Sequence, residues 1–141
     1  MVLTGIGEIG VNWDGQRFIL RPSLFAMTQL GSPEEIVRVY ASVMHEETHA
    51  DQFEDALAVI YACSDDQDAE LLGKVFGSLV KAVKGTGWRY KQGAAPITDI
   101  LPLARCLMRH GVVGDYDPLP VPANKDKEYT TEFKARDHVS L

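Results

Sequence analysis

The sequence predicts a mainly α protein: a compact helical domain of about five helices, with an N-terminal β-hairpin and an irregular C-terminal tail. Three observations predict this class. An Asp-Gly pair at residues 14–15 separates two short runs of β-forming residues. Apolar residues then recur at helical spacing in successive segments as far as residue 110. Beyond Val112 the chain becomes proline-rich and loses any sustained period.

The hairpin comprises residues 9–13 and 16–20, joined by Asp14 and Gly15. Asp-Gly between β-formers is a strong hairpin signal, because glycine accepts the positive φ of a two-residue turn. Pro22 then ends the strand, because proline lacks the N–H that a sheet ladder needs. A two-stranded hairpin is only marginally stable in water, so the following helices are expected to cover one of its faces.

The first helix is expected over residues 24–30, and the second begins at Ser32, an N-cap followed by Pro33 and by Glu35, which completes a capping box. Residues 45–50 form a polar break, and the third helix runs from near Thr48–Asp51 to about Cys63. Residues 64–68 cap a long fourth helix that is expected to extend through Val83. Within it, Gly73 and Gly77 would allow another helix to approach closely. Residues 84–96 are expected to be a basic, glycine-rich connection.

The last helix is expected from Thr98 or Asp99 through His110, with Gly111 ending it and Pro102 tolerated in its first turn. His110 would then cap the helix C-terminus, where a cationic side chain is favourable. The expected domain division is a helical domain with its hairpin over residues 1–111 and a flexible tail over residues 112–141.

Composition excludes several classes of protein. The chain has 141 residues, 45% of them hydrophobic, which is sufficient for one domain with a core. Its net charge of −6 argues against nucleic acid as a partner. No apolar run approaches the ~20 residues of a membrane span, and no signal peptide is expected. Cys63 and Cys106 are interpreted as reduced, buried thiols of a cytoplasmic protein.

One motif raises the question of metal chemistry. His45-Glu46-Glu47-Thr48-His49 matches H-E-x-x-H, which in zinc peptidases places two His ligands on one helical face beside a catalytic Glu. Here the motif coincides with the polar break between two helices, and the residue after His45-Glu46 is charged rather than apolar. The preferred interpretation is a solvated turn, so no cofactor is expected. A small zinc hydrolase using His45, Glu46 and His49 remains an alternative.

Two further patterns are interpreted as structural. The glycines at 5, 7 and 10 fit G-x-G-x-x-G but precede a strand, so they do not indicate a dinucleotide site. The basic residues near Trp88 and Tyr90 are interpreted as a solvated loop with an anchoring aromatic residue. No nucleophile set is recognisable, so the protein is not expected to be an enzyme.

Three features together resemble the small tail assembly chaperones of long-tailed, HK97-like bacteriophages. These are the N-terminal unit VNWDGQRFILRPSLFAMTQLGSPEEI, the segment ADQFEDALAVIYACSDD, in which a helix closes on an acidic turn, and the small acidic helical plan with a proline-rich tail. The likeness covers residues 9–68 in motif detail. It implies a non-enzymatic protein of the infected host bacterial cytoplasm that is absent from the mature virion.

The resemblance also implies partners. Such proteins bind and solubilise the phage tape-measure protein and promote assembly of the tail-tube protein around it, and homo-oligomers are compatible with that role. Apolar residues that tolerate many partner sequences would form the contact. The candidates are Phe25, Met27, Val43, Met44 and Trp88. The alternative from a different class is a tail-completion or connector protein that stays in the virion.

Overall fold

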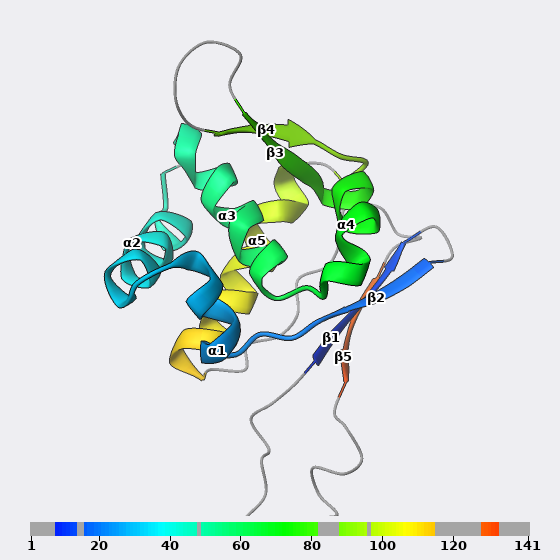
Figure 1. Cartoon of the computed structure of the whole chain (residues 1–141), viewed down its shortest axis with the longest axis horizontal. Helices are drawn as coiled ribbons and strands as arrows, with labels where there is room; N and C mark the ends of the chain where they lie inside the picture. Colours follow the sequence, from blue (N-terminus) through cyan, green and yellow to red (C-terminus); the bar gives the residue numbers. More distant parts are fainter. Residues whose placement is uncertain are drawn as a thin grey trace, which may run out of the picture.

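The computed structural model describes residues 8–13, 16–47, 49–81, 88–95, 97–114 and 128–132. Five α-helices in these residues form the body, and an N-terminal antiparallel hairpin lies against one side of it (Figure 1). The mainly α class with an N-terminal hairpin is therefore confirmed. The elements are, in order, β1 (Glu8–Trp13), β2 (Gln16–Leu20), α1 (Leu24–Met27), η1 (Thr28–Leu30), α2 (Pro33–Met44), α3 (Ala50–Ala62), η2 (Asp66–Asp68), α4 (Ala69–Phe76), β3 (Gly77–Lys81), β4 (Trp88–Gln92), α5 (Ile97–Met108), η3 (Arg109–Val113) and β5 (Glu128–Glu132).

The hairpin strands pair as predicted, with Val11 opposite Phe18 and Ile9 opposite Leu20. The turn at residues 14–15 lies outside the described residues. A third strand, β5, pairs antiparallel with the other edge of β1 and gives the order β2-β1-β5. The prediction of an irregular tail is therefore wrong for residues 128–132. The division at residue 112 otherwise stays a prediction, because most of the residues beyond it lie outside the described part of the chain.

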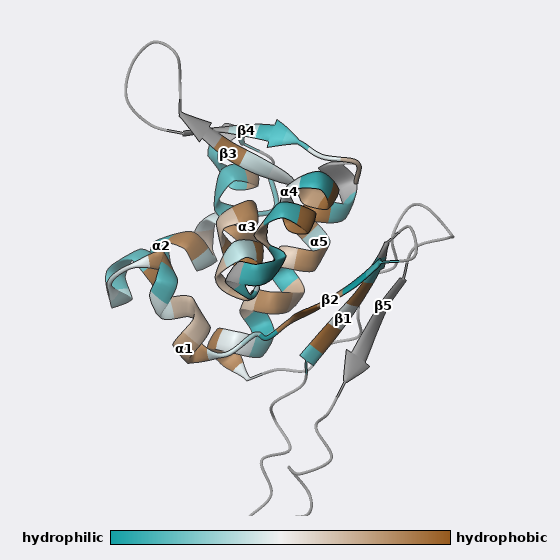
Figure 2. Cartoon of the chain, turned by 45° about the vertical axis from the view of Figure 1, so that its right-hand side comes forward, coloured by the Kyte–Doolittle hydropathy of each residue, from teal (hydrophilic) through white to brown (hydrophobic). Residues whose placement is uncertain are grey.

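The core lies within the helical body, where α3 packs along α5, and it extends to the apolar face of the hairpin. Figure 2 shows brown, hydrophobic ribbon in α3, in α5 and along β1. The rings of Phe18 on β2 and Phe76 on α4 meet edge to face, with centroids 6.1 Å apart. The hairpin's apolar face is thus covered by helical side chains, which supplies the burial that an isolated hairpin lacks.

The N-terminal boundaries of α1 and α2 follow from their caps. Ser23 Oγ accepts a hydrogen bond from the Ala26 N–H at 2.9 Å, and Ser32 Oγ accepts one from the Glu35 N–H at 3.3 Å. Each bond satisfies a backbone donor that has no partner within its own helix. The Glu35 carboxylate pairs with Arg38 at 3.1 Å, so the cap at Ser32 is confirmed while the Glu35 side chain serves a different contact.

The predicted long fourth helix is wrong beyond Phe76. Gly77 adopts φ 107° and ψ −174°, ends α4 and starts β3, which pairs with β4. A Cβ at Gly77 would collide with the Lys91 carbonyl oxygen, so only glycine fits there. The last carbonyls of α4 accept bonds from another segment: Ala94 N–H donates to Lys74 at 2.8 Å and Ala95 N–H to Val75 at 2.7 Å. Tertiary hydrogen bonding therefore overrides helical periodicity, and the segment expected to be a loop supplies the second strand.

The end of the last helix also differs from the expectation. After α5 the chain continues through one π turn, η3, and stops at Gly114, which has φ 76°. Gly111 does not end the helix: its lack of a side chain lets α1 approach, since a Cβ there would lie 2.8 Å from Met27 Cε. His110 is buried, with Nε2 at 3.6 Å from Cys106 Sγ, so it packs inside the protein rather than capping an exposed terminus.

Candidate functional site

A groove opens where α1 and η1 lie next to α2 and α3. It has a volume of about 970 Å³ and is lined by residues of α1, η1, α2, α3, α4 and β3, and of the segments before α1 and after α3. Its size lies at the upper end of ordinary ligand pockets, which span about 300–1,000 Å³. We refer to it as the α1–α3 groove.

Phe25 lines the α1–α3 groove while presenting 77% of its surface to solvent. The helix that carries it is held firmly at its start. The Arg21 N–H donates to the Cys63 carbonyl at 2.7 Å, and Arg21 Nε pairs with the buried Glu8 carboxylate at 2.8 Å. Ser23 then caps the helix. A backbone that is already fixed does not have to be ordered when the ring contacts a partner.

Small side chains make the inner part of the groove hollow. Ala26, Ala58 and Ala62 line it, together with Cys63. Burial raises the pKa of the Cys63 thiol to about 12, so this side chain stays protonated and behaves as a small apolar group. Tyr61 donates from its hydroxyl to the Gly77 carbonyl at 3.0 Å, and burial raises its pKa. The inner surface is therefore apolar, with its polar hydroxyl already satisfied.

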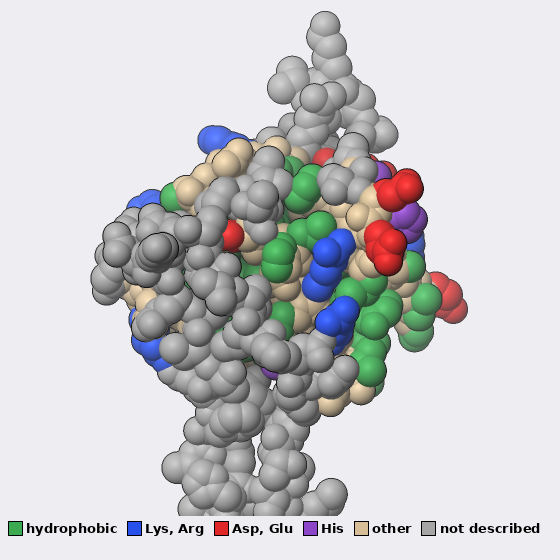
Figure 3. Space-filling view, turned by 180° about the vertical axis from the view of Figure 1, so that it is seen from behind, with side chains coloured by type: hydrophobic (Ala, Val, Ile, Leu, Met, Phe, Trp, Pro, Cys, Tyr) green, Lys and Arg blue, Asp and Glu red, His purple; other side chains and the backbone are tan. Residues whose placement is uncertain are grey.

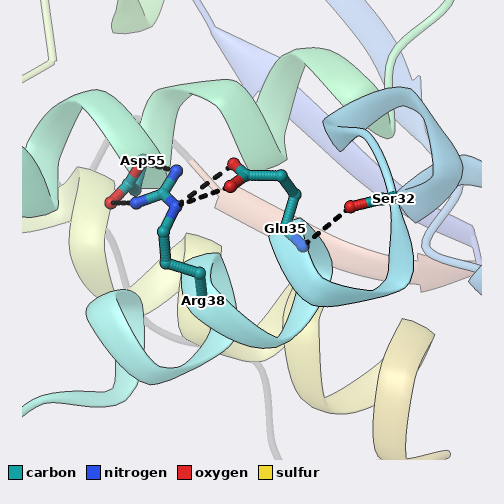
Figure 4. A network of polar contacts seen from close by, with 4 residues as sticks. All are labelled: Ser32, Glu35, Arg38 and Asp55. Atoms are coloured by element: carbon teal, nitrogen blue, oxygen red, sulfur yellow. Dashed lines mark hydrogen bonds and ion pairs between the residues drawn. The ribbon is translucent and has the colours of Figure 1, made fainter.

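A charged network borders the groove where α2 meets α3 (Figure 4). The Arg38 guanidinium on α2 donates to both carboxylate oxygens of Asp55 on α3, each at 3.3 Å. The same group donates through Nε to Glu35, at 3.1 Å from Oε2. The hydrogen bond to Asp55 raises the pKa of Arg38, and the hydrogen bond to Glu35 raises it by a smaller amount. Two carboxylates thus share one cation.

Further acidic groups lie near this network. Asp65 lines the groove, and its Oδ1 accepts from the Gln67 N–H at 3.3 Å. On α3, burial raises the pKa of the Glu54 carboxyl, and the neighbouring charges of Asp51 and Asp55 raise it further. Glu54 and Asp51 do not line the groove. On its α2–α3 side, the excess of negative charge comes from Glu35 and Asp55, two carboxylates that share the one guanidinium group of Arg38.

The H-E-x-x-H segment lies apart from the groove, in the turn between α2 and α3. His45 is the C-cap of α2 and His49 the N-cap of α3, both with extended backbone. Their rings are 5.8 Å apart and nearly perpendicular, and His45 Nδ1 lies 3.1 Å from the Glu47 N–H. Both side chains are exposed. In Figure 3, histidine and acidic side chains lie together at the edge where α2 meets α3.

Two side chains of other helices bind the last carbonyls of α2. Arg105 on α5 donates to the carbonyls of Val43 and His45, each at 2.8 Å. Gln52, which is fully buried, donates through Nε2 to the carbonyls of Ser42 at 3.1 Å and His45 at 2.9 Å. The last carbonyls of α2 are thus satisfied by side chains of other helices, which stabilises the end of the helix.

This geometry differs from that of a zinc peptidase. In the peptidase motif both His residues extend from one continuous helix, whereas here they cap two helices that meet at a turn. In the described part of the chain, no group of three or more His, Cys, Asp or Glu side chains is placed to hold a metal ion. The expected solvated turn agrees with this arrangement.

The structure separates the predicted partner-contact residues. Phe25 lines the groove, and Met44 is half-buried against the core. Met27 and Val43 are fully buried, so their assignment to a contact surface is wrong: both are core residues. Trp88 belongs to β4, opposite Lys81, and its side chain lies outside the described part of the structure. The remaining exposed large apolar residues in the described part are Leu24, Val37, Val112 and Val113.

Arg38 and Asp55 were not identified from the sequence, and Asp65 was expected only to cap the fourth helix. A spacing of three residues between Glu35 and Arg38 indicates a helical ion pair, but the bond from Arg38 to Asp55 depends on how α2 packs on α3. Also within the described residues, no helix has the length and apolar character needed to cross a membrane.

Comparison with known proteins gives a family but no activity. No curated protein and no solved structure matches the chain. The profile of a family described as "Family of unknown function (DUF6246)" matches residues 48–141, from the turn before α3 through β5. Because the match covers more than half of the 141 residues, the chain belongs to this family of unknown function, DUF6246.

Proposed function

We propose that this protein is a non-enzymatic tail assembly chaperone of a long-tailed bacteriophage, which binds the tape-measure protein and keeps it soluble while tail-tube subunits assemble around it. The observation that carries the proposal is the α1–α3 groove with the exposed Phe25 at its border. The resemblance of residues 9–68 to such chaperones supports the same role. The proposed location is the host bacterial cytoplasm, with the protein absent from the mature virion.

A chaperone for such a client must cover the client's exposed apolar surface. A long helical protein exposes an apolar stripe until its final partner covers it, and an apolar groove on a soluble protein can shield one part of that stripe. The net charge of −6 keeps the complex soluble.

Co-expression with a fragment of the tape-measure protein from the same phage tests the proposal. We expect the soluble fraction of that fragment to rise several-fold and the two chains to co-purify. A small acidic protein of unrelated fold, expressed at the same level, is the control for a general effect of charge. A fragment that stays insoluble and does not co-purify would contradict the proposal.

Mass spectrometry of purified phage particles is the second test. We expect no peptides from this protein in mature particles, although they should be present in the infected-cell lysate. Recovery from particles at a fixed number of copies would instead identify a tail-completion or connector protein.

A further inference from the structure

We propose that the α1–α3 groove binds an amphipathic helical segment whose apolar stripe is flanked by Lys or Arg side chains. This inference rests on the proposed chaperone function, because it specifies which part of a helical client is bound. In this proposal, Phe25 and the inner groove contact the apolar stripe of the client. The acidic side of the groove gives the selectivity for basic clients.

Phe25 combines an exposed aromatic ring with a fixed backbone, which suits it to an apolar contact. Phe25 is 77% exposed, and its helix is fixed by the backbone bond of Arg21 and the cap at Ser23. Behind it, alanine side chains leave a hollow that one or two apolar side chains of a partner would fill. Burial of these side chains removes apolar surface from water on both partners, which favours binding.

The charge of the groove selects the flanking residues. Arg21 is paired with Glu8, and Arg38 is shared by Glu35 and Asp55. Asp65 contacts no cation in the described part of the chain. The lining of the groove holds two guanidinium groups, Arg21 and Arg38, and two carboxylates, Asp55 and Asp65. Glu8 and Glu35 pair with the two arginines from outside the lining, so four carboxylates stand against two guanidinium groups in and around the groove. A helix bringing Lys or Arg along its apolar stripe would offset this excess, while one bringing Asp or Glu would increase the repulsion.

The test uses two synthetic, fluorescently labelled peptides of roughly 20 residues, long enough to form helix on binding. Both carry leucines at every third or fourth position; one has Lys and the other Glu at all flanking positions. Fluorescence anisotropy with the intact protein should give binding of the Lys peptide at least about tenfold tighter than that of the Glu peptide, with the preference falling as salt rises. Equal affinity, or no binding of either peptide, would overturn the proposal.

Two matched pairs of variants locate the contact. Phe25→Ala should weaken binding of the Lys peptide about tenfold, whereas Leu24→Ala should leave it within about twofold, because Leu24 is 61% exposed but does not line the groove. Asp65→Asn keeps an acceptor for the Gln67 N–H and should reduce the Lys preference. Glu70→Gln makes the same change of net charge outside the groove, on an 86% exposed side chain, and should not. Equal effects within either pair would overturn the assignment.

The outcome separates this inference from the function on which it rests. If the tape-measure fragment still co-purifies with Phe25→Ala and Asp65→Asn, the chaperone role stands and the groove assignment fails. If the Lys peptide binds as expected while the tape-measure fragment does not, the groove assignment stands and the client is a different helical protein. A Phe25-dependent dimer that excludes the peptide would overturn the assignment in favour of a second copy of the chain.

Discussion

Arg105 Nε donates a hydrogen bond of 2.8 Å to the carbonyl of Val43, across 62 residues of sequence. The bond joins α5 to the last turn of α2, and the same guanidinium also reaches the carbonyl of His45. A cationic donor at a helix C-terminus satisfies exposed carbonyls and interacts favourably with the helix dipole. The turn between α2 and α3 is therefore held by a residue far along the chain.

Replacement of Arg105 by Met should destabilise the protein by about 1–3 kcal/mol, because two carbonyls lose charge-assisted hydrogen bonds. Urea denaturation followed by circular dichroism measures the change in the free energy of unfolding. Lys74→Met is the control, since Lys74 is 73% exposed and its ion pair with Glu70 is a surface contact. A loss no larger than that of the control would show that the turn does not depend on Arg105.

Gly77→Ala should be among the most damaging single substitutions. It combines a backbone conformation that favours glycine with a collision against the Lys91 carbonyl, so we expect a loss of more than about 2 kcal/mol. Gly114→Ala separates the two causes, because Gly114 also has positive φ, 76°, but a Cβ there meets nothing. It should cost only about 1 kcal/mol. Thermal unfolding of both variants measures the two losses of stability. Similar losses would show that the collision with the Lys91 carbonyl does not determine where α4 ends.

Stability should fall in alkaline solution partly because of Cys63. Burial raises the pKa of its thiol from 9.0 to about 12, so the folded state disfavours the thiolate. This contribution is complete below pH 9, where the thiol is protonated in both states, and is lost as the pH rises towards 12. Burial also raises the pKa values of Tyr61 and Tyr90, which act in the same direction.

Comparison of the intact protein with Cys63→Ala isolates the thiol. The urea midpoint of the variant should fall less steeply between pH 9 and pH 11 than that of the unaltered protein. Identical slopes would mean that ionisation of Cys63 does not limit alkaline stability.

The histidine turn should not hold stoichiometric zinc. His45 and His49 cap different helices rather than extending from one. Elemental analysis of protein purified without a histidine tag should therefore give far less than one equivalent. Treatment with EDTA should leave the thermal unfolding midpoint unchanged. Stoichiometric zinc that disappears in His45→Ala would revive the hydrolase hypothesis.

The sequence predicted those features that depend on neighbours along the chain. The Asp-Gly hairpin and the Ser32 cap have local causes, and the structure contains the paired hairpin strands and the cap. The break at His45 was predicted from its polar local sequence, although Gln52 and Arg105 also hold the end of α2 in the structure. The end of α4 at Phe76 was not predictable from neighbouring residues. Leu79 and Val80 continue a helical period, but Gly77, the Ala94 and Ala95 amides and the pairing with β4 determine the outcome.

The candidate site was predicted only in part. Phe25 was identified as an apolar residue in a helix, and its position at a groove depends on the packing of α1 against α3. Met27, two residues further along the same short helix, faces the core. Periodicity over a single turn cannot distinguish these two faces, and the pairing of Arg38 with Asp55 joins residues 17 positions apart.

The place of β5 beside β1 has a consequence for biosynthesis. Gly10 pairs with Thr130, so the central strand of this sheet is synthesised well before β5, one of its two neighbours. Until residues 128–132 have been translated, one edge of β1 has only water or another nascent chain to pair with. A premature stop codon after α5 would leave that edge permanently open, so truncated products should aggregate even though α1 to α5 are all present.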